Sequence, residues 1–167
     1  AHRGTFDLSS HSKQSGKDLA VFDDVTKSSY TPTVIECSVG TDRSFLMLLF
    51  DAYCEDVVEG EVRTVLKLAP TVAPIKAALL PLTKKQIEPA MRLYADLQKL
   101  GVHIDFDESG SIGKRYRRHD EIGTPVCFTY DFESDNDLKI TARNRDTTHQ
   151  ERISLDSVCS YLLNILR

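Results

Sequence analysis

The second half of this 167-residue sequence predicts a three-layer α/β domain, with helices on both faces of one sheet. Two observations lead to that fold class. From residue 73 onward, short apolar runs of strand length alternate with longer segments that carry apolar residues at helical spacing, and Pro or Gly closes several of them. The five strands and three helices expected between residues 71 and 167 are enough to bury a core of their own.

The elements of this half follow in a regular order. The first strand is the apolar run at 75–80, closed by Pro81. The first helix spans 86–100 and stops before Gly101, which suits the left-handed turn that ends a helix. The remaining elements are, in chain order, a strand at 102–106, a helix at 109–123, strands at 126–132 and 138–143, a brief edge strand or turn at 151–155, and a final helix with Val158, Tyr161, Leu162 and Ile165 on its apolar face.

The first half is less regular. Residues 1–31 are polar and show no apolar periodicity, so we expect loops with one short strand. Residues 55–64 are charged and contain a glycine, which predicts a surface connection. Pro70 and Pro74 then mark a boundary. The predicted domains are therefore 1–70 and 71–167.

Composition excludes several classes of protein. The hydrophobic fraction of 41% and the charged fraction of 28% are those of an ordinary soluble globular protein, and a net charge of -4 excludes a wholly basic nucleic-acid binder. The four cysteines are too widely spaced for a zinc site, so we expect reduced thiols in a cytosolic protein. The sequence shows no membrane span and no signal peptide. It opens without methionine in what reads as the middle of a domain, so we expect a fragment.

A polar cluster follows the β-branched run at 34–35. Glu36 and Ser38 are two residues apart, so on a strand both side chains project to one face. An acid beside a hydroxyl suits a small ligand that carries an ammonium group, and Arg43 suits a phosphate. Asp42 is expected to cap the apolar helix that follows, at 44–53. The alternative is a structural salt bridge between the acid and Arg43.

A basic segment opens the helix expected at 109–123. Its four cations, which follow a glycine-flanked turn, are Lys114, Arg115, Arg117 and Arg118. Backbone N–H groups at a helix start bind phosphate, and the cations would extend such a site. The alternative is a solvated helix face whose arginines pair with acids such as Asp120 and Glu121.

Two arginines, Arg143 and Arg145, alternate on the strand expected at 138–143 and its end. They could bind phosphates or base edges, and a surface ladder of ion pairs is the alternative. Three aromatic residues could stack on unpaired bases or belong to the core: Tyr116, Phe128 and Tyr130.

Together these stretches resemble the C-terminal part of a class II glycyl-tRNA synthetase, over nearly the whole chain. Residues 34–43, V-I-E-C-S-V-G-T-D-R, resemble the third class-defining motif of that family, V-I-E-P-S-x-G-x-D-R. Residues 73–82 resemble the first strand of its anticodon-binding domain. Residues 107–116, D-E-S-G-S-I-G-K-R-Y, residues 120–125, D-E-I-G-T-P, and residues 143–146 also follow the family pattern. Cys37 departs from the usual proline, and Asn144 from the usual acid.

The resemblance implies a fold and a function. It implies an anticodon-binding domain with a mixed five-stranded sheet and three helices at 71–167, preceded by the C-terminal piece of an antiparallel catalytic domain. The full-length protein would be a cytoplasmic, homodimeric glycine–tRNA ligase that uses ATP with Mg2+, glycine and tRNA(Gly). No zinc site and no membrane partner are expected. This chain lacks the first two motifs of the family, so by itself it is expected to be inactive.

The resemblance also implies roles for individual residues. Glu36 and Ser38 would bind glycine, and Glu36 and Arg43 would bind ATP. Arg43 would be the catalytic residue, because it stabilises the charge that develops during adenylate formation. The anticodon arm would contact the cations of the second domain: Lys114, Arg115, Arg117, Arg118, Arg143 and Arg145.

Three other interpretations remain. A non-catalytic, synthetase-like accessory subunit of a DNA polymerase would share the fold, but the intact Glu36, Ser38 and Arg43 argue against it. A class II synthetase for threonine, proline or histidine would share the second domain, but the motif strings favour glycine. A generic α/β domain would use its basic helix only for surface ion pairs.

Overall fold

The computed structural model describes residues 1–58 and 60–167, and its internal contacts divide the chain into two units, residues 1–44 and 45–167. Within the two described ranges, no helix is both long enough and apolar enough to cross a membrane.

The first unit is built from two small antiparallel sheets and one helix. Strand β1 (His2–Gly4) pairs with β4 (Val34–Ile35), and β2 (Val21–Asp23) pairs with β3 (Ser28–Tyr30). Helix α1 (Phe6–Ser15) lies where the sequence predicted loop, so that prediction was wrong. The reason is that α1 buries none of its side chains, and it therefore lacks the apolar stripe by which helices are recognised.

Helix α2 (Thr41–Ala52) begins three residues before the predicted start, with Asp42 in its first turn, where a carboxylate favours the helix dipole. Its apolar side chains are exposed to an unusual degree: Phe45, Met47 and Phe50 are 63%, 63% and 77% exposed. Large apolar side chains are seldom exposed in such number on one helix unless another surface packs against them.

Residues 53–58 and 61–66 form a pair of antiparallel strands, here called the hairpin, where a surface connection was predicted at 55–64. Strand β5 (Tyr53–Val58) pairs antiparallel with β6 (Glu61–Leu66), with Tyr53 opposite Leu66. One face of β6 is buried through Arg63 and Val65, while the alternate residues stay more exposed. The hairpin was not predicted because its sequence is rich in charged residues, and one of them, Arg63, is buried. Because the hairpin packs on the α/β domain, the contacts divide the chain after residue 44 rather than near residue 70. The domain boundary at residue 70 stays a prediction.

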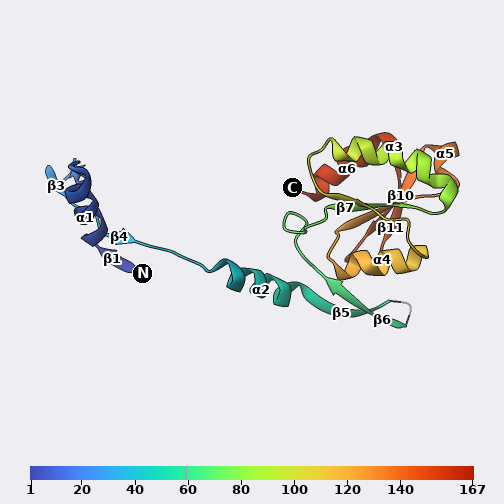
Figure 1. The fold of residues 1–167 in the computed structure, drawn as a ribbon, viewed down its shortest axis with the longest axis horizontal. Helices are drawn as coiled ribbons and strands as arrows, with labels where there is room; N and C mark the ends of the chain where they lie inside the picture. The colour runs from blue at the N-terminus through green and yellow to red at the C-terminus, as the bar shows by residue number, and fades with distance from the viewer. Residues whose placement is uncertain (59) are drawn as a thin grey trace. The chain divides into compact units, whose positions relative to one another are not determined.

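The α/β domain has the predicted mixed five-stranded sheet, with the strand order β11-β10-β9-β7-β8. Strand β7 runs parallel to both β8 and β9, whereas β10 and β11 are antiparallel to their neighbours. Helices α3 and α6 cover one face of this sheet and α4 covers the other (Figure 1). The elements are β7 (Ala77–Pro81), a 3-10 turn (Lys84–Gln86), α3 (Ile87–Gln98), β8 (Ile104–Phe106), α4 (Ile112–Glu121), β9 (Val126–Tyr130), α5 (Ser134–Asp137), β10 (Lys139–Asn144), β11 (Gln150–Ser154), a 3-10 turn (Leu155–Ser157) and α6 (Val158–Ile165).

The three predicted helices and the five strands are confirmed, and the single-turn helix α5 is an addition. Strands β7 and β9 are buried at every position, as expected for central strands covered on both faces. The main core lies between the sheet and helices α3 and α6, and its fully buried members include Leu79, Leu97, Phe128, Ile140 and Leu162.

Gly123 follows α4 and lies against Leu66 and Leu68, where the chain leaves the hairpin. Its backbone is left-handed, with φ +82°, and a Cβ there would lie 2.9 Å from the carbonyl oxygen of Leu66 and 3.1 Å from Cδ1 of Leu68. Only glycine combines this conformation with so close an approach.

We therefore expect Gly123→Ala to destabilise the domain by more than the roughly 1–2 kcal/mol that a left-handed alanine costs. Gly101→Ala is the matched control, since Gly101 has φ +70° and open space around the added methyl group. Urea unfolding of both variants checks the prediction. Equal losses would show that Leu66 does not press on Gly123.

Candidate nucleic-acid interface

The loops at the carboxyl ends of β7 and β8 separate from one another. The chain after β7 leads to α3 on one face of the sheet, and the chain after β8 leads to α4 on the other (Figure 1). Such a switch point in an open α/β sheet leaves a crevice in which ligands bind. A hollow of about 390 Å³ lies there, and Thr83, Lys84, Glu108 and Gly110 are among the residues that line it.

Arg115 ties these two loops together. Its side chain is buried and lines the hollow. Its Nη1 donates hydrogen bonds to the carbonyl oxygens of Pro81, at 2.7 Å, and Asp107, at 3.0 Å. Its Nε is also buried and has no hydrogen-bond partner in the described part of the chain. A buried donor of this kind is rarely left unpaired. Arg115 is therefore first a structural tie, with one donor still available.

A larger groove of about 820 Å³ lies along the outer side of α4 and shares Gly110 with the first hollow. Its cations are Lys114, Arg117, Arg118 and Arg143, and polar residues near β11 complete it: Thr148 and Gln150. The acids Glu61 and Glu121 also line the groove. The predicted basic segment thus forms one wall of a polar groove rather than an isolated helix face.

The outer cations of this groove make weak, exchangeable contacts. Arg117 pairs with Glu61 at 3.2 Å, and Glu61 is highly exposed. Arg118 donates to the carbonyl oxygen of Ser109 at 2.8 Å and lies 3.1 Å from Asp107. Lys114 is exposed. An exposed ion pair such as Arg117–Glu61 contributes at most about 1 kcal/mol, so a phosphate can replace it at little cost, whereas the Asp107 partner of Arg118 is buried.

The inner arginine of the groove is held rigidly. Arg143 is 6% exposed and makes two parallel hydrogen bonds to Asp120, at 2.8 and 2.9 Å. Its guanidinium carbon lies 4.7 Å from the centre of the Tyr116 ring, a favourable cation–π distance. The Tyr116 hydroxyl in turn hydrogen-bonds to Thr129 at 2.6 Å.

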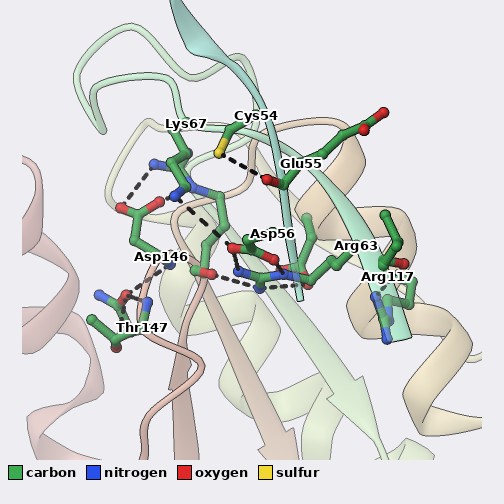
Figure 2. Close-up of polar contacts among 12 residues, drawn as sticks. Cys54, Glu55, Asp56, Arg63, Lys67, Arg117, Asp146 and Thr147 are labelled. Carbon is green, nitrogen blue, oxygen red and sulfur yellow. Dashed lines mark hydrogen bonds and ion pairs between the residues drawn. The ribbon is translucent and has the colours of Figure 1, made fainter. Parts of the chain in front are cut away.

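A second buried arginine, Arg63 of β6, donates to the same Asp120 at 3.1 Å. Figure 2 shows Arg63 on the hairpin beside Asp56, which accepts hydrogen bonds from its Nε and Nη2 at 2.8 and 2.5 Å. No role was predicted for Arg63 from the sequence, and Asp120 was expected only to form a surface pair. The two-residue alternation of E-V-R-T-V-L, with Arg63 and Val65 on one face, is the signal that could have revealed Arg63.

Arg145 has a different environment from the one expected. It is 2% exposed, and it donates to the carbonyl oxygens of Gly123, at 2.8 Å, and Leu68, at 2.9 Å. Its Nε binds Asp146 at 2.8 Å. The anticodon contacts predicted for the six cations remain predictions, but burial argues against direct contact by Arg115 and Arg145. Arg143 and Arg145 are both buried, so they do not form the surface ladder of ion pairs that was the alternative. Phe128 and Tyr130 are core residues.

The residues of the predicted glycine and ATP site lie in the first unit. Strand β4 ends at Ile35, and the backbone of the next residue, Glu36, exchanges two hydrogen bonds with Ala1. Glu36 and Ser38 follow this strand, and their projection to one face stays a prediction. Glu36 is 3.6 Å from Arg3, and among the described residues no ion pair joins it to Arg43. Ser38 and Arg43 are exposed.

Comparison with known proteins gives a consistent result. Residues 76–165 match the family described as "Anticodon binding domain". Over 162 residues the chain is 54% identical to a protein named Glycine--tRNA ligase from Caldanaerobacter subterraneus subsp. tengcongensis, and over 163 residues it is 52% identical to one of that name from Clostridium beijerinckii. Each alignment covers 97% of this chain but only 35% of the relative, so the chain spans about a third of their length.

A solved structure is also similar. It is the RNA binding domain of threonyl-tRNA synthetase from Cryptosporidium parvum Iowa II, with a TM-score of 0.55 and 26% identity. The match covers 59% of this chain and 25% of the other.

Buried beneath the groove loops, His119 faces two carboxylates. Its Nδ1 lies 3.1 Å from the Thr124 hydroxyl, and its Nε2 lies 3.7 Å from both Asp105 and Asp107. Burial lowers the pKa of His119 below its ordinary value, although Asp105 and Asp107 oppose this shift.

Because the pKa of His119 is lower in the folded state than in the unfolded state, the unfolded chain binds the proton more tightly. We therefore expect the stability that His119 contributes to be complete above its ordinary pKa of about 6.5 and to fall as the pH falls through that value. Urea unfolding at pH 7.5 and at pH 5.5 measures this loss, and His119→Gln should reduce it. The same loss in both proteins would show that another group is responsible.

Proposed function

This chain belongs to the anticodon-binding domain family, and we propose that it forms part of a glycine–tRNA ligase. The observation that carries this proposal is the identity of 54% to a protein of that name, which extends over 97% of the chain and so beyond residues 76–165. On this proposal, residues 71–167 bind the anticodon arm of tRNA(Gly), and residues 1–70 belong to the catalytic domain. A cytoplasmic homodimer as the full-length form belongs to the same proposal.

The second domain would read the anticodon with two layers of cations. Lys114, Arg117 and Arg118 line the groove with exchangeable contacts, which suits the phosphates that position an RNA strand. Arg143 and Gln150 lie in the same groove, and Arg143 is held in one orientation, which suits the edge of an unpaired base. The hollow at the switch point, with Lys84 on its wall, would extend the site.

The first unit would supply one wall of the site that activates glycine. Glycine attacks the α-phosphate of ATP, forming glycyl-adenylate and releasing pyrophosphate, and the glycyl group then passes to tRNA with release of AMP. Glu36 would bind the substrate ammonium group, Ser38 would limit the space beside it, and Arg43 would stabilise negative charge on the phosphates of ATP with Mg2+. All three are exposed in this chain, which fits a wall that other residues of the enzyme complete.

Binding of tRNA tests the first part of the proposal. At fixed salt, the chain should bind a tRNA(Gly) transcript at least about tenfold more tightly than a transcript whose two cytosines in the second and third anticodon positions are changed, since a good bidentate base contact contributes roughly 1–3 kcal/mol of discrimination. Lys114→Ala should weaken binding of both transcripts equally and reduce the salt dependence by about 0.7–0.9 of a counterion.

Lys99→Ala is the matched control for that charge. Lys99 follows α3 on the opposite face of the sheet, where it pairs with Asp96, so its loss should change neither affinity (Figure 1). Equal binding of the two transcripts by the unmodified chain would contradict anticodon reading and would favour the accessory-subunit interpretation.

ATP–pyrophosphate exchange tests the second part. We expect no glycine-dependent exchange by the 167 residues alone, because they provide only one wall of the site. In the full-length enzyme, Glu36→Gln should raise the KM for glycine about 10- to 100-fold, as expected for the loss of a charged hydrogen bond of roughly 1.5–3 kcal/mol. Glu61→Gln makes the same change on the hairpin and should leave exchange unaffected. Exchange by the isolated chain, or an unchanged KM in Glu36→Gln, would refute this assignment.

A further inference from the structure

We propose that Arg63 is a positioning residue for anticodon recognition, which fixes the orientation of Arg143 through the shared carboxylate of Asp120. The inference rests on the proposed function and adds to it a residue outside the matched domain. Arg63 lies on β6 of the hairpin, whereas the family match begins at residue 76. The hairpin would thus belong to the unit that reads the anticodon.

Arg63 cannot contact RNA itself. Its side chain is 1% exposed, and its donors are used within the domain. Nε and Nη2 bind Asp56 (Figure 2). Nη1 donates to Asp120 at 3.1 Å and to the carbonyl oxygen of Arg145 at 2.8 Å. Its effect on a ligand must therefore pass through these neighbours.

The Oδ1 of Asp120 accepts from Arg143, and its Oδ2 accepts from both Arg143, at 2.9 Å, and Arg63, at 3.1 Å. With Arg143 as its single partner, the Asp120 carboxylate would be held along one edge, and the Arg143–Asp120 pair could rotate as a unit. The hydrogen bond from Arg63 comes from a different element and fixes that remaining freedom. Two arginines and two aspartates, Asp56 and Asp120, also balance the charge of the network.

Arg143 lines the groove on α4 and lies over the Tyr116 ring, so a change in its guanidinium plane changes the donors presented to a ligand. A bidentate donor recognises a planar acceptor only when the two planes match. Loss of Arg63 should therefore reduce discrimination among anticodons, while the phosphate contacts of the outer cations remain.

The test uses Arg63→Met in the 167-residue chain, with Arg92→Met as the control. Loss of Arg92 removes the same charge from α3, where within the described part of the chain its one ion pair is an exposed contact with Glu88. With Arg63→Met, we expect the preference for the tRNA(Gly) transcript over the anticodon variant to fall about tenfold, with an unchanged salt dependence. Arg92→Met should keep the full preference. A merely structural defect would lower the active fraction for both transcripts and leave their ratio intact, and that result would overturn the proposal.

Arg63→Lys covers the case in which Arg63→Met fails to fold. Lysine keeps the charge but lacks the planar set of donors, so it should also lose discrimination, and retention of the full preference would overturn the proposal. A double-mutant cycle with Arg143→Lys should show that the two losses are not additive, and independent losses would count against coupling.

A direct readout separates this inference from the proposed function. The Nε–Hε signal of Arg143 in an NMR spectrum, assigned with Arg143→Lys, should shift or broaden in Arg63→Lys and stay in place in Arg92→Met. An unshifted signal would overturn the positioning role whatever the RNA results. Equal binding of both transcripts by the unmodified chain would instead refute the proposed function, and the Arg143 signal would still decide whether Arg63 orients Arg143.

Discussion

The carboxylate of Asp120 is the contact on which the second unit depends. It is fully buried near the end of α4 and accepts hydrogen bonds from Arg63 of the hairpin and Arg143 of the sheet, so one side chain joins three elements far apart in sequence. Removing one partner from such a network costs about 3–5 kcal/mol, because an unpaired charge is left buried. The network therefore fixes the arrangement of hairpin, helix and sheet, and not only their stability.

Around this centre the cations divide into two classes with different physical roles. Arg63, Arg115 and Arg145 are buried and spend their donors on carboxylates and carbonyl oxygens, and thereby hold loops and the hairpin in place. Lys114, Arg117 and Arg118 remain at the groove with contacts that an RNA phosphate can displace. Arg143 combines both roles, because it is hydrogen-bonded to the buried Asp120 and also lines the groove. A rigid inner layer beneath an adaptable outer layer suits a surface that must read bases as well as bind phosphates.

The two units differ in how complete they are. The second unit encloses its own core around Leu79 and Phe128. The first unit leaves large apolar side chains such as Phe6, Phe22 and Ile35 exposed.

The sequence by itself determined the elements of the α/β domain and its family. Apolar spacing, Pro81 and Gly101 are local signals, and they located strands and helices whose faces are buried in the ordinary way. Tertiary structure alone decided the positions of the charged residues. Arg63 meets Asp120 across 57 positions of the sequence, and Arg145 meets Leu68 across 77. A charge is predicted at the surface unless its partner is known, and partners so distant become known only when the chain is folded. For the same reason the hairpin was hidden: its inward face carries an arginine whose burial depends on a carboxylate from another element.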